Sequence, residues 1–358
     1  MRNEIRYVEH PGFIIKESIG ELGLSQQEFA LRTGLTTKNV STLLNGESPI
    51  TFEIAVKLGN FFDINPQSWL NLQNHYDLYI NQEKRKEELN QEWNIAKLFT
   101  NSKAKRCLNI DISSKDKKDA ILKLRSLFKV ANLNLLKQSD MYAFCKTAVI
   151  KDIDETTIIM RNAWISLAEQ VGRGMQVSKF DKQYLLSSIE SIKSLTKEEP
   201  KVFLPKLRDI LSNGGIKLVI IPYLTHSNVG GFTKWIAQEE CSLIAINDCD
   251  KDADKIWFSI FHELGHAIKN HRRHPTISYN KNPVIDDDEI DANNFAKDKL
   301  LNPLDYKIFT EEGNFSLTCI NRFAKSQNVA NFIVIGRLQK DGYLNWSTYS
   351  DYKIKYDW

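Results

Sequence analysis

The chain has 358 residues, of which 42% are hydrophobic and 26% charged, so it is long enough for two or three domains and is not wholly disordered. The net charge of +3 argues neither for nor against a nucleic-acid partner, and the five scattered cysteines, without a Cys-x-x-Cys pair, are typical of a reduced cytosolic protein. Residues 1–9 lack the apolar segment of a signal peptide, and no apolar run approaches the roughly 18 residues of a membrane span. We therefore expect a soluble, cytoplasmic protein without a membrane partner.

Short helices with clear caps are predicted throughout residues 1–80. Each predicted start is a Ser, Thr or Pro followed by apolar residues at helical spacing, and Ser25 forms a capping box with Glu28. The predicted limits, in chain order, are Pro11 and Gly23, Ser25 and Gly34, Thr36 or Thr37 and Gly46, Thr51 and Phe62, with a fifth helix starting at Pro66.

The second and third of these helices are joined by a tight turn that contains glycine, which predicts a helix-turn-helix. The third helix would then be the recognition helix, with its polar face toward operator DNA. The candidate DNA contacts are Thr37, Lys38, Asn39 and Thr42 to base edges, and Thr36 and Ser41 to phosphates.

Charge keeps a second interpretation of this module open. Residues 1–80 hold six lysines and arginines against nine aspartates and glutamates, a charge of −3, whereas a phosphate-binding face is normally basic. The next stretch, residues 81–130, has a charge of +6 and either supplies phosphate contacts or is a solvated linker. The alternative to DNA binding is a small helical bundle that docks protein.

Several motifs in residues 1–80 follow one another in an order that resembles the HigA-type antitoxin family of helix-turn-helix regulators. This resemblance implies a homodimer that binds a palindromic operator and represses its own promoter. The motifs are His10-Pro11-Gly12, Gly23-Leu24-Ser25-Gln26, Leu44-Asn45-Gly46, Trp69-Leu70-Asn71-Leu72-Gln73 and Tyr76-Asp77-Leu78.

Further along, residues 131–200 read as helical without a chemical motif, and strand patterns follow from residue 201. A helix then carries His262, Glu263 and His266. Because residues four apart share a helix face, both histidines can bind one zinc ion. Glu263 points about 100° away around the helix, where it can serve as the general base for a water molecule. The alternative, a helix with two surface histidines, is disfavoured by its apolar stripe.

A catalytic zinc needs a third protein ligand and one open position. Five acids follow downstream, at residues 286–289 and 291, and they equally suit the N-terminal turn of a helix. Spacing alone does not choose among them.

A second resemblance, to the ImmA/IrrE family of metallopeptidases, covers about residues 200–305 and distinguishes among these five acids. It implies that Glu289 is the third ligand, with Asp291 as second choice; ligand type favours Zn²⁺ and also admits manganese. The matching stretches are Gly215 to Ile220, Gly231-Phe232, Ser242 to Asn247, Phe258 to His266, Glu289 to Ala296 and Leu300 to Pro303.

The roles of several other polar residues around the expected metal site are not decided by the sequence. His226, Tyr223 and Tyr279 are equally unsupported candidates for stabilising an oxyanion, and the more conservative prediction for His271 and His274 is solvent exposure past the helix end. The strand of residues 242–247 is expected beside the active-site helix, where a peptide substrate could add to an exposed sheet edge.

Together these patterns predict an α+β protein with four parts. They are a helix-turn-helix domain (1–80), a basic linker with a helical middle region (81–200), a zincin-like metallopeptidase domain with a small sheet (201–310) and a C-terminal extension of unknown role (311–358). The expected function is a DNA-binding regulator with zinc-dependent endopeptidase activity, which cleaves a transcriptional repressor or a toxin-antitoxin partner. The alternative is a HigA-type repressor whose metal domain only senses or binds a partner.

Overall fold

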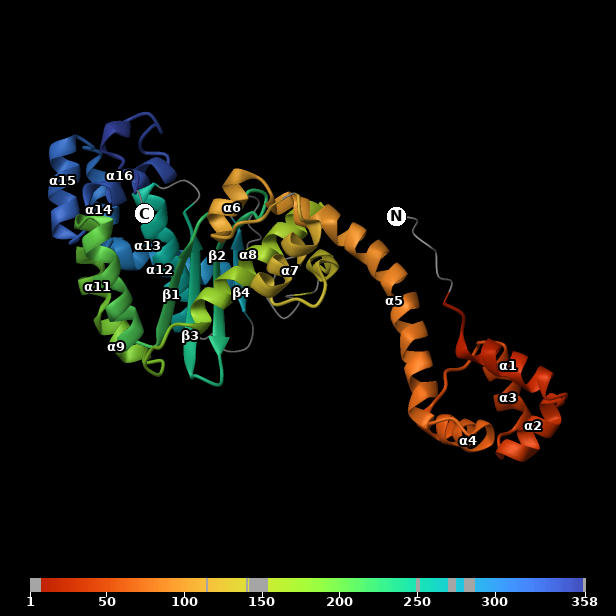
Figure 1. Ribbon diagram of the computed structural model, residues 1–358. Coiled ribbons are helices and arrows are strands. Elements are labelled where there is room, and N and C mark those ends of the chain that lie inside the picture. Colours follow the sequence, from red (N-terminus) through yellow and green to blue (C-terminus); the bar gives the residue numbers. More distant parts are fainter. Residues whose placement is uncertain are drawn as a thin grey trace. The chain divides into compact units, whose positions relative to one another are not determined.

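The computed structural model describes residues 8–113, 115–139, 141, 154–248, 252–269, 275–279 and 287–356. The chain divides into two compact units, residues 1–91 and 92–358, whose elements are drawn in Figure 1. The secondary structure is a helical N-terminal part followed by helices around a small mixed sheet, so the α+β prediction is confirmed. Within the described residues, no helix combines the length and the apolar character needed to cross a membrane.

The first unit consists of helices with the predicted starts. The capping box of Ser25 and Glu28 is present, and Thr36 rather than Thr37 caps the third helix. The helices are α1 (Pro11–Glu21), α2 (Gln26–Thr33), α3 (Thr37–Leu44), α4 (Phe52–Phe62) and α5 (Pro66–Ala96).

The His10-Pro11-Gly12 motif caps α1 and allows it to pack closely against α3. The buried His10 side chain caps α1 by accepting from the Gly12 amide at 3.0 Å, and Pro11 takes the first helical position. A Cβ atom on Gly12 would stand 1.8 Å from the Leu43 carbonyl oxygen. Only glycine therefore permits this approach, which brings the first helix against the predicted recognition helix.

Helix α5 differs from the prediction of a linker beginning at residue 81. It runs for 31 residues, through the charge run, to Ala96. Near its end Glu92 is fully buried; it accepts hydrogen bonds from Arg125 Nε at 2.7 Å and from the Leu133 amide at 2.9 Å. These bonds hold the last turn of α5 within the second unit, which begins at Glu92.

The second unit begins with helices, of which α8 and α11 contact the sheet. Helix α8 packs on the sheet where Gly172 meets the Leu243 side chain, which a Cβ atom would approach to 2.7 Å. The elements are η1 (Lys97–Phe99), α6 (Ser102–Leu108), α7 (Lys117–Phe128), η2 (Leu133–Lys137), α8 (Glu155–Arg173), α9 (Lys182–Ser187), α10 (Ile189–Ser194), η3 (Leu195–Lys197) and α11 (Pro200–Asn213).

The sheet has four strands in the order β1-β3-β2-β4. They are β1 (Ile216–Ile221), β2 (Val229–Ile236), β3 (Cys241–Asn247) and β4 (Thr276–Tyr279); β3 pairs in parallel with β1, and β2 pairs antiparallel with both β3 and β4. The expectation that a substrate adds to the strand of residues 242–247 is wrong, since β3 is central and all seven of its residues are buried.

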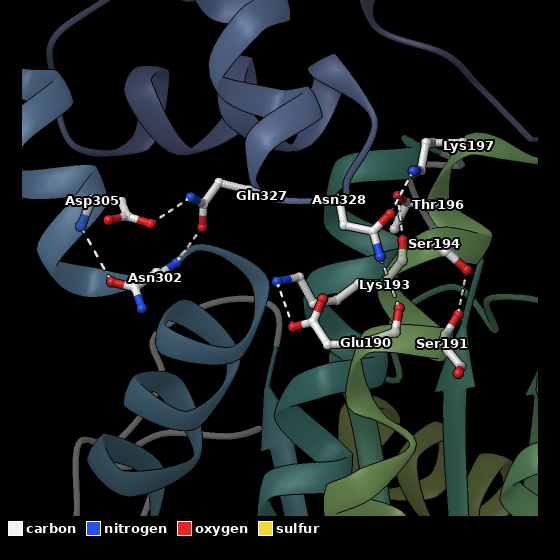
Figure 2. A network of polar contacts seen from close by, with 10 residues as sticks. All are labelled: Glu190, Ser191, Lys193, Ser194, Thr196, Lys197, Asn302, Asp305, Gln327 and Asn328. Carbon is white, nitrogen blue, oxygen red and sulfur yellow. Dashed lines mark hydrogen bonds and ion pairs between the residues drawn. The ribbon is translucent and has the colours of Figure 1, made fainter.

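The C-terminal segment belongs to the same core as the sheet. Tyr356 is buried, and its hydroxyl accepts from Trp257 Nε1 at 2.8 Å on helix α12. Figure 2 shows how Asn328 spans neighbouring elements: its amide donates to the Glu190 carbonyl at 3.1 Å and its oxygen accepts from Lys197 at 2.6 Å. The helices are α12 (Ala253–Lys269), α13 (Asp287–Leu300), α14 (Pro303–Glu312), α15 (Leu317–Ser326), α16 (Asn331–Lys340) and η4 (Ser350–Tyr352).

Because α1 approaches α3 closely at only one of its glycines, replacement of Gly12 and of Gly20 by alanine should change the free energy of unfolding in opposite directions. Gly12→Ala should lower the free energy of unfolding of the first unit by about 2 kcal/mol or more, because the methyl group meets the Leu43 carbonyl. Gly20→Ala meets nothing within 4 Å and should raise it by about 0.5–1 kcal/mol. Hydrogen exchange of peptides from residues 8–78, read by mass spectrometry, measures both; equal effects would contradict this account of the motif.

Candidate functional site

Helix α12 carries the histidine motif on a face that is buried against the sheet. Trp257, Phe261 and Leu264 of this helix are fully buried in the core, so the helix orientation is fixed by packing. His262 is 6% exposed, and Glu263 and His266 are 0% exposed. The interpretation of these residues as a solvated helix face therefore does not hold.

Three side chains from two helices converge within hydrogen-bond distance. The Nε2 atoms of His262 and His266 are 3.1 Å apart, and Glu289 on α13 places one carboxylate oxygen 3.3 Å from the first and the other 3.2 Å from the second. A tetrahedral zinc ion with Zn–N bonds of about 2.0–2.1 Å separates its ligand atoms by about 3.3–3.4 Å. These residues therefore fit a divalent cation, in ligand type and in spacing.

Charge complements the cluster as well. Burial lowers the pKa of His262, but the hydrogen bond to Glu289 and the charges of Glu263 and Glu289 outweigh it and raise this pKa above its ordinary value. Burial raises the pKa of Glu289, and the hydrogen bonds from His262 and His266 more than reverse this, holding it at about 2. Glu289 is thus an anion that faces both imidazoles.

Glu263 lies beside this cluster and is held by β2. Its Oε2 accepts from the Thr233 hydroxyl at 2.6 Å, whereas Oε1 is buried and has no hydrogen-bond partner among the described residues. One ligand atom each from His262, Glu263 and His266 lies within 4.8 Å of the others. An unsatisfied buried carboxylate oxygen at this distance is suited to a water molecule between Glu263 and a cation.

Two glycines make room for this arrangement. A Cβ atom on Gly231 of β2 would stand 2.0 Å from Glu263 Oε1, so the carboxylate fits only beside a glycine. On the other side of α12, a Cβ atom on Gly265 would come within 3.2 Å of the Ala292 Cα atom, so its absence lets α13 approach closely. The Gly231 and Gly265 positions therefore set the distances of β2 and α13 from the motif.

Other residues that the sequence suggested for this site do not join the cluster of His262, His266 and Glu289 in the described residues. Asp291, the second choice for the third ligand, is 55% exposed in its side chain and pairs with Lys269 at 3.2 Å. The Tyr223 amide donates a hydrogen bond to Asp248 at 2.7 Å, and His226 interacts electrostatically with Asp154. Neither observation supports an oxyanion role for Tyr223 or His226. Asp286, His271 and His274 lie outside the described residues.

Sequence reasoning missed two side chains of the site. Thr233 on β2 orients Glu263, and Ser278 on β4 lies 3.1 Å from His262 Nε2. Thr233 is followed directly by Lys234, so β2 lacks an alternating pattern, and the alternation of polar and apolar residues in β4 covers only four residues. Neither strand therefore carries a sequence signal that would have placed these side chains toward the motif.

The candidate DNA-binding residues gather at the start of α3. Side chains 36–39 are exposed, and Ser41 and Thr42 are half-buried. Thr42 is already engaged, since its hydroxyl donates to the Lys38 and Asn39 carbonyls at 3.2 Å and accepts from Ser48 at 3.1 Å. Among the six candidates, Thr37, Lys38 and Asn39 have exposed side chains that make no hydrogen bond within the described residues.

Comparison with known proteins finds a family match in each of the two units. Residues 15–69 match the helix-turn-helix family model, and residues 215–316 match the Peptidase M78 model, described as an IrrE N-terminal-like domain. An uncharacterized HTH-type transcriptional regulator of Escherichia coli K12, YddM, is 44% identical over 68 residues, which are 19% of this chain and 72% of that protein. Virulence-associated protein I of Dichelobacter nodosus is 31% identical over 90 residues, 25% of this chain and 82% of that protein.

Two solved structures are similar to about a quarter of this chain. An addiction module antidote protein of the HigA family from Coxiella burnetii is 34% identical and covers 23% of this chain and 91% of that one, with a TM-score of 0.22. The Pseudomonas aeruginosa antitoxin HigA with the higBA promoter is 27% identical and covers 23% and 89%, also with a TM-score of 0.22. The chain thus belongs to the helix-turn-helix transcriptional regulators and carries an IrrE N-terminal-like domain of the M78 metallopeptidase family in its second unit.

The geometry predicts which acid holds the metal. Glu289→Ala should weaken zinc binding more than about 100-fold, because removal of even a supporting residue around a metal costs 10–100-fold. Asp291→Ala, two residues along the same helix, should bind zinc as the wild type does, since it only loses its pair with Lys269. Competition with a chromophoric chelator measures both affinities; a weaker Asp291 variant beside an unaffected Glu289 variant would reverse the assignment.

Proposed function

We propose that this protein is a DNA-binding regulator with zinc-dependent endopeptidase activity, acting on a transcriptional repressor or a toxin-antitoxin partner. The observation that carries the proposal is the buried carboxylate of Glu263, with Oε2 fixed by Thr233 and Oε1 unsatisfied among the described residues. The helix-turn-helix would bring this activity to an operator as a homodimer. A regulator that binds chromosomal DNA acts in the cytoplasm, which is part of the proposal.

The metal ligands in this proposal are His262, His266 and Glu289. When bound, a divalent cation such as Zn²⁺ polarises the scissile carbonyl and makes a nearby water molecule more acidic. Oε1 of Glu263 accepts the proton of the attacking water and then delivers it to the leaving amine. The hydrogen bond from Thr233 at 2.6 Å keeps the carboxylate from turning away during both transfers.

The alternative is a repressor whose metal domain only senses a signal or binds a partner. Such a domain would need only side chains that hold the metal ion. It would not need a general base, and a buried carboxylate with an unsatisfied oxygen destabilises a fold that does not use it. Glu263 and the glycine that accommodates it are therefore better explained by catalysis.

The base is tested by Glu263→Gln, which preserves the size of the side chain. The variant should hold about one zinc ion per chain and cleave at least about 100-fold more slowly, since general base catalysis contributes 10²–10⁴-fold. The substrates to assay are repressors and partner proteins encoded next to this gene, with metal content measured on the same samples.

The matched control is Glu169→Gln, an acid that pairs with Lys234 of the same strand β2 but lies on α8. It should cleave as the wild type does. If the wild type and both variants hold zinc, none cleaves any partner and operator binding is intact, the metal domain is a sensor and the repressor alternative takes first place.

DNA binding is tested at α3. Lys38→Ala should cost about 1–3 kcal/mol at the operator and little on unrelated DNA, if Lys38 meets a base edge as expected. Asn39→Ala should cost about 1–3 kcal/mol at the operator and little on unrelated DNA, if Asn39 meets a base edge. Fluorescence anisotropy over a salt series measures both, with Lys16→Ala on α1 as control.

An affinity for DNA that does not change with salt would instead favour the protein-docking alternative for the first unit. The charge of −3 on residues 1–80 makes this comparison informative, because few cationic side chains are present to release counterions.

A further inference from the structure

Ser278 lies inside the candidate metal cluster, although neither the motif nor the family resemblance points to it. Its Oγ atom is 3.1 Å from His262 Nε2 and 3.5 Å from Glu289 Oε1, and the residue is 9% exposed. It thus contacts two of the three proposed metal ligands at the atoms that would bind the ion.

The atom contacted on His262 distinguishes two possible roles for Ser278. A residue that only orients a metal-binding histidine bonds the ring nitrogen that does not bind the metal. Ser278 instead contacts Nε2, the nitrogen that also faces His266 and Glu289. The hydroxyl therefore lies on the metal side of the imidazole.

The distances also fit a fourth ligand. Four atoms around a tetrahedral zinc ion are separated by about 3.3–3.4 Å. The three proposed ligands are 3.1–3.3 Å from one another, and Ser278 Oγ adds separations of 3.1 and 3.5 Å. The hydroxyl oxygen thus lies at ligand-like separations from two of the three proposed ligands, as an atom would at the position that a catalytic site keeps open for water or substrate.

Strand pairing explains how Ser278 reaches this position. β4 pairs with β2, with Ser278 opposite Gly231 and Thr276 opposite Thr233. Because alternate residues of a strand share a face, Ser278 and Thr276 point to the same side as the glycine beside Glu263 and the threonine that binds it. A β-bulge between Val229 and Gly231 sets this register. The outermost strand of the sheet therefore delivers a hydroxyl to the cluster.

We propose that Ser278 is an internal fourth ligand, which closes the metal centre until its hydroxyl is displaced. This inference rests on the metal site of the proposed function and adds its regulation. The neutral hydroxyl competes for one coordination position with water and with the carbonyl of a polypeptide substrate. A rotation about the Cα–Cβ bond of Ser278, or release of β4 from β2, would open the position.

The test uses the full chain loaded with cobalt(II), whose visible spectrum reports ligands at the metal, and acetohydroxamate as the probe for an open position. Ser278→Ala should bind the probe at least about tenfold more tightly than the wild type, which corresponds to a wild-type centre closed for about nine-tenths of the time. Thr276→Ala, on the same strand and face, should match the wild type. Ser278→Cys should add a thiolate-to-cobalt charge-transfer band in the near ultraviolet.

Equal probe affinity in Ser278→Ala and the wild type, or a Ser278→Cys spectrum without the charge-transfer band, would overturn the proposal. If the wild type takes up no metal ion, the closed centre and the proposed peptidase both fail. If the cobalt spectra behave as expected but no partner protein is cleaved by the zinc form, the closed centre stands and only the peptidase proposal fails.

Discussion

The buried carboxylate of Glu263 is the constraint on which the second unit depends. A carboxylate removed from water destabilises a fold unless hydrogen bonds or a charge compensate it. Thr233 compensates one oxygen at 2.6 Å, and one carboxylate oxygen lies within 4.8 Å of a ring nitrogen of each imidazole. The strand beside it must be free of a Cβ atom at Gly231, so the spacing between β2 and α12 follows from this one side chain.

The position of α13 follows from the same helix. Gly265 lets α13 approach α12 closely, and this approach brings Glu289 between His262 and His266. The anion and the two imidazoles then stabilise one another, which is the physical reason for the pKa of about 2 at Glu289. Each element around the motif thus has a role in placing one charged or polar atom.

Local features of the sequence were sufficient for much of this description. The capping box at Ser25 and Glu28 and the two histidines four residues apart each depend on a few consecutive residues, and local sequence determines such geometry. The proposed third ligand lies 26 residues beyond Glu263 in the sequence, so spacing left five acids open and only the family resemblance favoured Glu289.

Features that depend on distant pairing were not predictable in the same way. Whether β3 is central or at an edge depends on β1 and β2 pairing with it on both sides, which no residue of β3 encodes. The same holds for Ser278, whose strand has only four residues. The continuation of α5 through the charge run was within reach, since Glu, Lys, Arg and Gln favour helices and no glycine or proline interrupts them.

The most direct measurement of the central claim is an anomalous difference map at the zinc edge from crystals of the zinc-loaded protein. The account predicts one peak within bonding distance of His262, His266 and Glu289, with Glu263 outside the bonding distance of the ion and still paired with Thr233. A peak bound directly by Glu263, or one held by Asp291 in place of Glu289, would contradict it.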